Sequence, residues 1–284
     1  MLTKNNWLQT NIKKRVQERQ LSLEVTLTPD IISSTDFNSA ADKVLTELLD
    51  LSATEKFYLG FSGGADSDFV FYKLIEWGIP FEPIICFFGG NSIEYQYALH
   101  TCKKFGITPY IHTLSEKQFI QIFMQKVKPW GGDGLYSIPS MVLAEYAKSR
   151  DAKLLTGQDF ITGSHDHCSM GFNVYDFYAD IYDESIEIPF FLYNTDIVYH
   201  TIKRFNPNIS VGEWKYELFE ILDYRPKIEF HHLSRECWEV LGPYFSYAAT
   251  HFNNEGIDVI NKEKILRALE NTGEKIVLNA SHTY

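Results

Sequence analysis

The sequence contains few cysteines, and none of them are paired at the spacing that binds zinc or an iron–sulfur cluster. Only four occur in 284 residues, and no two form a C-x-x-C pair. They are Cys86, Cys102, Cys168 and Cys237. This disfavours zinc ribbons, iron–sulfur proteins and disulfide frameworks. We expect reduced thiols and a cytoplasmic location.

Long apolar runs and an excess of basic residues are also absent. No stretch of about 18 apolar residues occurs, so no membrane span is expected. The polar segment Met1–Gln20 lacks the apolar core of a signal peptide. The formal net charge is −11, whereas a protein that neutralises nucleic-acid phosphates needs a basic surface. The bulk charge therefore counts against a DNA or RNA substrate, although a local basic patch stays open.

Short apolar runs alternate with helical patterns between residues 57 and 156. The runs are Phe57–Phe61, Phe81–Phe88, Thr108–Leu114 and Lys153–Thr156, and the helical patterns are Asp66–Trp77, Asn91–Phe105 and Ser137–Lys148. Such alternation predicts an α/β fold with a parallel sheet, in which ligands bind beyond the carboxyl ends of the strands. We expect the glycine-bearing loops Ser62–Gly64, Gly89–Gly90 and Gly157 to converge on one rim of that sheet.

The pattern is weaker on either side of this region. Before it, we predict a helix over Asn5–Arg19, a strand over Leu21–Leu27 and a helix over Asp36–Leu51. After it, we predict helices over Glu213–Leu222 and Lys262–Ala268 and a loose C-terminus from Asn279. The predicted organisation is an N-terminal extension (1–52), an α/β domain (53–165) and a mainly helical C-terminal lobe (166–284). The acidic stretch Asp176–Glu187 is typical of a solvated face; if it lined the cleft, it would favour an amine or cationic substrate.

The segment Ser62-Gly-Gly-Ala-Asp-Ser67 has the features of a phosphate-binding loop. It lies where an apolar strand runs into a helix. Glycines let backbone N–H groups approach an anion closely, and a helix N-terminus adds partial positive charge. Ser62 and Ser67 offer hydroxyl donors, and Asp66 beside a phosphate favours a bridging Mg²⁺. The loop has no lysine, so it is not a Walker A loop. The alternative is a plain tight turn in which Asp66 caps the helix.

This loop resembles the S-G-G-x-D-S loop of the PP-loop ATP pyrophosphatases, the N-type adenine nucleotide α-hydrolase superfamily. That superfamily includes asparagine synthetase, GMP synthetase, NAD synthetase, argininosuccinate synthetase and several tRNA-modifying enzymes. The resemblance covers residues 57–160. It implies a Rossmann-like, HUP-type parallel sheet with helices on both faces, ATP and Mg²⁺ as cofactors, and contacts from Ser62, Gly63, Gly64, Asp66 and Ser67 to the nucleotide. It also implies that pyrophosphate leaves when a substrate oxygen attacks the α-phosphate.

A distal segment is similar to the Arg-x-Lys-x-x-Phe segment of asparagine synthetase domains. It contains Arg225, Lys227 and Phe230. In that family the lysine lies by the phosphates, so Lys227, with Arg225 beside it, is the candidate for stabilising charge in the transition state. The alternative is a surface lysine that flanks an edge strand.

Two further loops match the superfamily less closely. Gly157 and Asp159 resemble its next conserved loop, which makes Gly157 a nucleotide contact and Asp159 a second Mg²⁺ ligand beside Asp66. In several relatives the acid lies four or five residues beyond the glycine, where this chain has Ile161 and Thr162, so an ordinary turn carboxylate is the alternative, and Asp166 is a weaker candidate. Phe87 and Phe88 are predicted to pack against a face of the adenine ring, with core packing as the alternative.

The predicted function is an asparagine-synthetase-like ligation. ATP adenylylates a carboxylate or carbonyl oxygen of a small molecule, and a nitrogen nucleophile then displaces AMP. Residue 2 is Leu2 rather than a catalytic cysteine, and about 56 residues before the loop are too few for a glutaminase. We therefore expect free ammonia, an amine on the substrate or a separate glutaminase as the nitrogen source, and an oligomer stays open. The alternatives are a tRNA- or nucleobase-modifying adenylylating enzyme and a non-catalytic ATP-binding module.

Overall fold

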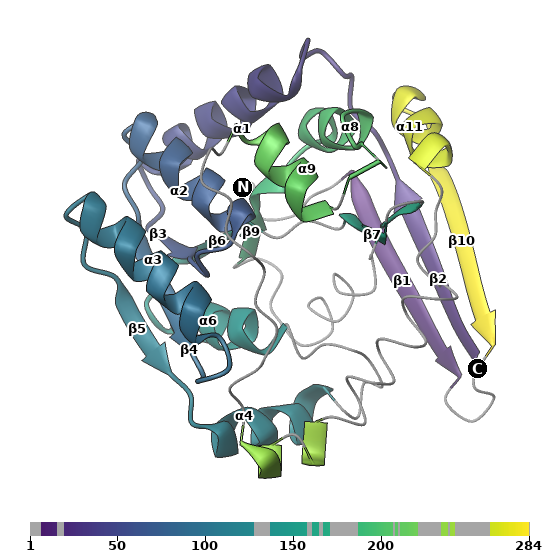
Figure 1. Ribbon diagram of the computed structural model, residues 1–284. Coiled ribbons are helices and arrows are strands. Elements are labelled where there is room, and N and C mark those ends of the chain that lie inside the picture. The colour runs from purple at the N-terminus through teal and green to yellow at the C-terminus, as the bar shows by residue number, and fades with distance from the viewer. Residues whose placement is uncertain are drawn as a thin grey trace.

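The computed structural model describes residues 7–15, 20–127, 137–157, 161–164, 167–170, 187–206, 208–209, 211–220, 234–237, 239–241 and 262–283. A five-stranded parallel sheet forms its centre (Figure 1). The strands are β3 (Phe57–Gly60), β4 (Glu82–Phe87), β5 (Tyr110–Thr113), β6 (Lys153–Thr156) and β9 (Glu187–Pro189). Their order across the sheet is β5-β4-β3-β6-β9, and each described pairing is parallel. The predicted α/β fold with a Rossmann-like parallel sheet is confirmed.

The inner strands β3 and β4 are buried on both faces of the sheet, and their successive side chains point to opposite sides. In β3, Phe57 and Leu59 belong to one hydrophobic cluster, whereas Tyr58 belongs to the other. In β4, Ile85 lies in the first cluster and Ile84 in the second. The strands therefore read as continuous apolar runs, as is usual in parallel sheets that are covered on both sides.

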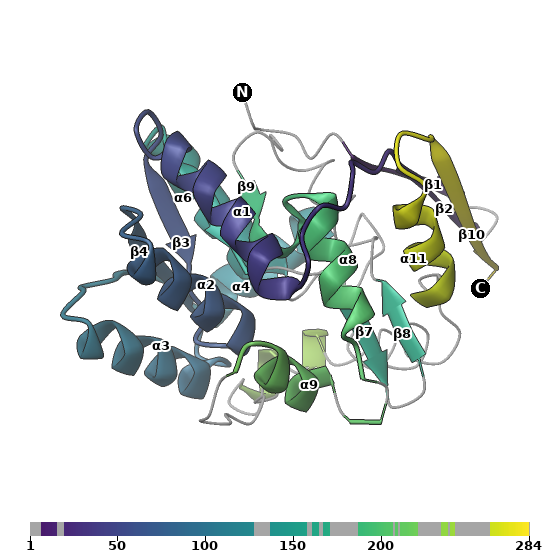
Figure 2. The same cartoon turned by 90° about the horizontal axis from the view of Figure 1, so that it is seen from above.

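Helices cover the two faces, as predicted. The first cluster takes residues from α1 (Phe37–Leu51), α2 (Ala65–Glu76), α3 (Ser92–Lys104), α8 (Thr195–Lys203), α9 (Val211–Leu218) and α11 (Lys262–Glu270). The second cluster takes residues from α4 (Glu116–Ile122), the π-helix η2 (Phe123–Val127) and α6 (Ser137–Ser149). Figure 2 shows α2 and α3 on one side of β3 and β4 and α6 on the other. None of the described helices combines the length and apolarity needed to cross a bilayer.

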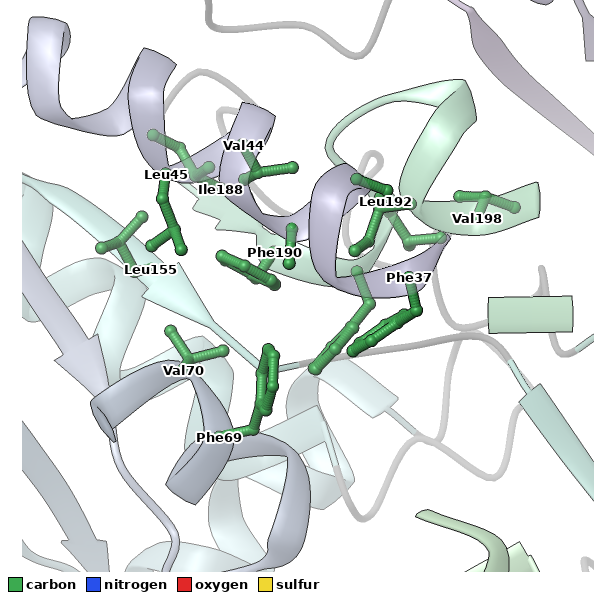
Figure 3. Packing of buried hydrophobic residues seen from close by; sticks show 14 of the residues in the cluster. Phe37, Val44, Leu45, Phe69, Val70, Leu155, Ile188, Phe190, Leu192 and Val198 are labelled. Atoms are coloured by element: carbon green, nitrogen blue, oxygen red, sulfur yellow. The ribbon is translucent and has the colours of Figure 1, made fainter. Parts of the chain in front are cut away.

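The N-terminal region contributes directly to the core. α1 begins after Asp36, whose carboxylate accepts the Ser39 N–H at 2.8 Å in a capping box. Its apolar stripe includes Val44 and Leu45, which pack with Phe69 of α2 and Phe190 of the short 3₁₀ helix η4 (Phe190–Leu192) in the same cluster (Figure 3). Beyond residue 165, strand β9 joins the sheet beside β6. Residues on both sides of the predicted boundaries at 52 and 165 thus contribute to this core and sheet, and the division into domains stays a prediction.

A second sheet joins the two ends of the described chain. Strands β1 (Leu8–Arg15), β2 (Gln20–Leu27) and β10 (Ile276–Thr283) form an antiparallel sheet with β2 in the middle. The strand predicted over Leu21–Leu27 is confirmed. The helix predicted over Asn5–Arg19 and the loose C-terminus predicted from Asn279 are wrong, because both segments pair with β2 and that pairing has no local sequence signal.

The two helices predicted after residue 165 agree with the structure to within about a turn. α9 ends at Leu218, before the predicted end at Leu222, and α11 runs two residues beyond the predicted Ala268. A small hairpin of β7 (Ile161–Ser164) and β8 (His167–Met170) follows β6. The C-terminal lobe is thus helical over α8, α9 and α11, with strands β8, β9 and β10 among its described residues.

Candidate nucleotide site

The strand order reverses between β3 and β6. From β3 the chain builds the sheet outward through β4 to β5, and then crosses back to place β6 on the other side of β3. In open α/β sheets, ligands bind beyond the carboxyl ends of the strands where the order reverses in this way. The loop after β3 is Ser62–Gly64, and Gly157 follows β6. The sequence-predicted loops therefore flank the expected crevice.

The two loops touch. A Cβ atom added to Gly157 would lie 2.6 Å from the carbonyl carbon of Asp66 and 2.7 Å from the backbone nitrogen of Ser67. No side chain fits at such a separation, so glycine is required where the β6 loop crosses the first turn of α2. The expected convergence of Gly157 with the Ser62–Ser67 loop is confirmed by this contact.

The two glycines of the loop have different surroundings. Gly63 has φ +83°, and its Cβ would overlap the Glu94 carbonyl oxygen and lie 2.7 Å from the Ala98 backbone nitrogen of α3. Gly64 has φ −78° and is the N-cap of α2. Its Cβ would meet only the Ser62 hydroxyl oxygen, at 3.4 Å. Gly63 thus lets the loop pack against α3, whereas the Cβ position of Gly64 has no close neighbour other than the Ser62 hydroxyl.

The two serine hydroxyls of the loop hold it together. The Ser62 and Ser67 hydroxyl oxygens lie 3.1 Å apart, and Ser62 Oγ accepts the Gly64 N–H at 3.2 Å. Ser67 donates to the Gly64 carbonyl oxygen at 3.0 Å and is buried, whereas Ser62 is exposed. Of the two predicted hydroxyl donors, Ser62 is therefore the one placed on the open side of the loop.

Asp66 does not cap α2, which excludes the alternative proposed for it from sequence. The N-cap is Gly64, and it makes no side-chain capping bond. The Asp66 carboxylate instead forms an ion pair with Lys215 of α9, with Oδ2 and Nζ 2.7 Å apart. Their side chains are 27% and 13% exposed, so the pair is partly shielded from water. Lys215 was missed in the sequence because 149 positions separate it from Asp66.

Aromatic packing fixes α9 beside the loop. Phe219, just after α9, stacks on Phe69 of α2 with ring centroids 4.7 Å apart and on Phe191 at 5.1 Å. Trp214, next to Lys215, is buried and donates its indole N–H to the Arg204 carbonyl oxygen at 2.9 Å. The backbone on both sides of Lys215 is therefore anchored in the core.

The loop after β4 is organised by Asn91. This buried side chain donates to the Cys86 carbonyl oxygen at 2.8 Å and accepts the Phe88 N–H at 3.1 Å. Phe88 is 4% exposed and stacks on Phe119 of the second cluster, which corresponds to the core-packing alternative. Phe87 is half-buried and packs on Tyr95 of α3, so of the two it is the one that remains open to a ligand.

Glu187 is a further polar residue near the expected crevice. At the start of β9, its Oε1 accepts the hydroxyl of Thr156, the residue before Gly157, at 2.8 Å. Burial raises the pKa of Glu187 to about 7, and the Thr156 hydrogen bond opposes that rise. In the sequence, Glu187 ends an acidic stretch that is typical of a solvated face. The pairing of β9 with β6 places it beside Thr156 in the central sheet.

The remaining predicted site residues lie outside the described residues: Asp159, Arg225 and Lys227, with Asp166 as the weaker alternative. Within the described part of the chain, no group of three or more His, Cys, Asp or Glu side chains gathers as a metal site. A Mg²⁺ bound with a nucleotide needs only one or two carboxylates besides the phosphates. Asp66, in the first turn of α2, supplies one such carboxylate.

No protein-family model and no curated protein matches this chain. Among solved structures it is similar to an NMN synthetase from Francisella tularensis, with 15% identity and a TM-score of 0.37 over 76% of this chain and 96% of that one. A predicted subunit of tRNA methyltransferase from Methanocaldococcus jannaschii has 17% identity and a TM-score of 0.37 over 73% and 97%. An NH3-dependent NAD synthetase from Campylobacter jejuni has 14% identity and a TM-score of 0.36 over 76% and 96%. These values are too low to carry an argument about function, which depends on the chain's own residues.

Proposed function

We propose that this protein binds ATP in the Ser62–Ser67 loop and uses it to adenylylate a carboxylate or carbonyl oxygen of a small molecule. The substrate oxygen attacks the α-phosphorus, the bond between that phosphorus and the bridging oxygen of the β-phosphate breaks, and pyrophosphate leaves. A nitrogen nucleophile then forms a bond to the activated carbon, and AMP departs with the oxygen. The nitrogen comes from ammonia, an amine or a separate glutaminase.

The observation that carries this proposal is the geometry of the loop. Gly64 is the N-cap of a 12-residue helix, and its Cβ position has no close neighbour other than the Ser62 hydroxyl. The first-turn N–H groups of that helix point outward along the axis. The loop lies at the reversal of strand order, where a nucleotide is expected. Its sequence is the one that resembles the pyrophosphate-releasing superfamily rather than a Walker A loop.

The charged groups beside the loop suit a polyphosphate. Asp66 would hold Mg²⁺, and Asp159 is the second ligand that the superfamily resemblance implies. A Mg²⁺ ion bound there would neutralise negative charge on the departing pyrophosphate. Lys215 provides a cation within 2.7 Å of Asp66, and the resemblance assigns a similar electrostatic role to Lys227, with Arg225 next to it.

A product assay tests this function. Purified protein is incubated with ATP, Mg²⁺, ammonium and a panel of carboxylic acids, and pyrophosphate and AMP are quantified. We expect both products from the wild type and neither from Asp66→Ala, with unchanged far-ultraviolet circular dichroism. Asp42→Ala, which removes an exposed carboxylate of α1, is the matched control and should keep activity. Formation of ADP and phosphate instead would refute the assignment.

The same assay separates the two alternatives. A tRNA- or nucleobase-modifying enzyme would release pyrophosphate only when bulk tRNA or a free base replaces the acids. A non-catalytic module would bind ATP in calorimetry and release no pyrophosphate under any condition. The net charge of −11 favours a small-molecule acceptor over tRNA, because a tRNA partner requires a basic surface.

A further inference from the structure

A lysine is paired with the carboxylate that would bind the metal. Lys215 Nζ lies 2.7 Å from Asp66 Oδ2, and both side chains are partly shielded from solvent. A divalent cation placed on the same carboxylate would lie within a few ångströms of the ammonium group. Two cations at that separation, away from bulk water, repel each other strongly. Lys215 and a bare metal ion therefore compete for Asp66.

Only the side chain of Lys215 can move between partners, because core packing holds α9 in place. Phe219 stacks on Phe69 and Phe191, and Trp214 is buried and hydrogen-bonded to Arg204. A lysine has a flexible four-carbon stem and a compact charge. Its ammonium group can move from one anion to a neighbouring one without any rearrangement of α9. The loop next to Asp66 is where the proposed nucleotide would bring such an anion.

We propose that Lys215 guards the metal site: it neutralises Asp66 while the loop is empty and turns to the phosphates when ATP arrives, which frees Asp66 for Mg²⁺. This inference rests on the proposed function and adds an order of events to it. A polyphosphate carries more negative charge than one carboxylate, so it draws the lysine away from Asp66. The metal accordingly enters with the nucleotide or after it.

The proposal predicts two opposite effects of one substitution. Lys215→Met removes the competitor, so nucleotide-free protein should bind Mn²⁺ about tenfold more tightly or better. The same change removes a phosphate partner, so metal-free ATP should bind at least about tenfold more weakly. A lysine that merely packs against the loop would produce neither opposite shift.

Both arms are binding measurements. Mn²⁺ binding is followed by water-proton relaxation without nucleotide, and ATP binding by calorimetry in the presence of a chelator. Lys117→Met, at an exposed lysine of α4 on the other face of the sheet, is the matched control and should match the wild type in both. Asp66→Asn combined with Lys215→Met should abolish the gain in Mn²⁺ affinity. If Lys215→Met fails to fold, Lys215→Gln replaces it.

The outcomes distinguish this inference from the function on which it rests. Unchanged or weaker Mn²⁺ binding by the Lys215 variant overturns the guarding role, whatever ATP does. Tighter Mn²⁺ binding that survives loss of the Asp66 carboxylate overturns it as well. A wild-type protein that binds no ATP, with or without Mg²⁺, overturns the proposed function itself, whereas the Mn²⁺ arm still reports whether Lys215 masks Asp66.

Discussion

The two glycines of the Ser62–Ser67 loop allow its structural and its binding requirements to be measured separately. Replacement of each by alanine adds the same methyl group at adjacent positions. At Gly63 the new Cβ enters a left-handed residue with φ +83° and lies 2.7 Å from the Ala98 backbone nitrogen. At Gly64 it enters an ordinary extended residue with φ −78° and meets only the Ser62 hydroxyl.

The expected changes in the free energy of unfolding differ accordingly. Gly63→Ala combines a left-handed non-glycine residue with an overlap on the backbone of α3, so we expect a loss of about 3 kcal/mol. Gly64→Ala lowers the entropy of the unfolded chain but makes a poorer helix cap, and these opposite effects leave stability within about 1 kcal/mol of the wild type. Its methyl group instead occupies the space through which a phosphate would reach the helix N-terminus.

Urea unfolding and calorimetric titration with Mg²⁺-ATP measure the two properties. Gly64→Ala should unfold like the wild type and bind ATP at least about tenfold more weakly, which corresponds to about 1.4 kcal/mol. Gly78→Ala is the control for backbone strain alone, because Gly78 has φ +65° after α2 and its Cβ would meet nothing within 4 Å. It should lose some stability and keep ATP affinity.

One result would refute the assignment of the loop. If Gly64→Ala folds normally and binds ATP as tightly as the wild type, no phosphate approaches the first turn of α2 closely enough to feel a methyl group. A stable Gly63→Ala variant would instead contradict the close packing of the loop on α3, and with it the local geometry from which the site is argued.

Three further predictions concern single residues. Lys227→Ala should lower the rate of pyrophosphate release in single turnovers by at least about tenfold with little change in ATP affinity, because the role proposed for it is electrostatic; a kinetically silent variant would remove the support for asparagine-synthetase-like chemistry. The raised pKa of Glu187, about 7 against the model value 4.5, keeps its carboxyl protonated in the fold below about pH 7. Stability should therefore fall by up to about 3 kcal/mol as pH rises from 4.5 through 7, and Glu187→Gln should abolish this fall in urea unfolding at about pH 5 and pH 8. Asn91→Ala leaves the Cys86 carbonyl and the Phe88 N–H without their partner and should cost about 2–3 kcal/mol by the same method, whereas a change below about 0.5 kcal/mol would contradict its role in the β4 loop.

The central strands and helices were predictable because their signals are local. The apolar runs, the helical patterns between them and the glycines at the ends of β3, β4 and β6 all lie within a few residues of one another, so the sequence of 57–156 predicts most of its own fold. The loop Ser62–Ser67 was predictable for the same reason. The family resemblance predicts that Gly157 contacts the nucleotide. The structure adds a steric reason for glycine at this position, because a Cβ atom would overlap the backbone of Asp66 and Ser67.

Residues brought together from distant positions were not predictable. The Asp66–Lys215 pair forms where α9 packs on α2 through the stacking of Phe219 on Phe69. No sequence pattern near residue 215 indicates this packing. Glu187 joined the site through the pairing of β9 with β6, although its acidic neighbours indicated a solvated face. Leu8–Arg15 lies within the predicted helix Asn5–Arg19 but forms strand β1. Its conformation depends on pairing with β2, and local propensity is a weak guide to secondary structure that forms by such pairing.

The three-stranded sheet has a consequence for how this chain is made. The pairing of Ile276 with Leu27 closes a loop of roughly 250 residues, so on the ribosome β2 has β1 beside it long before β10 emerges. During that interval one edge of β2 presents unpaired backbone groups to other nascent chains, the kind of edge from which aggregation begins. Completion of this sheet therefore requires synthesis to reach β10. A chain truncated before Ile276 would keep the Ser62–Ser67 loop but leave one edge of β2 unpaired and prone to aggregation.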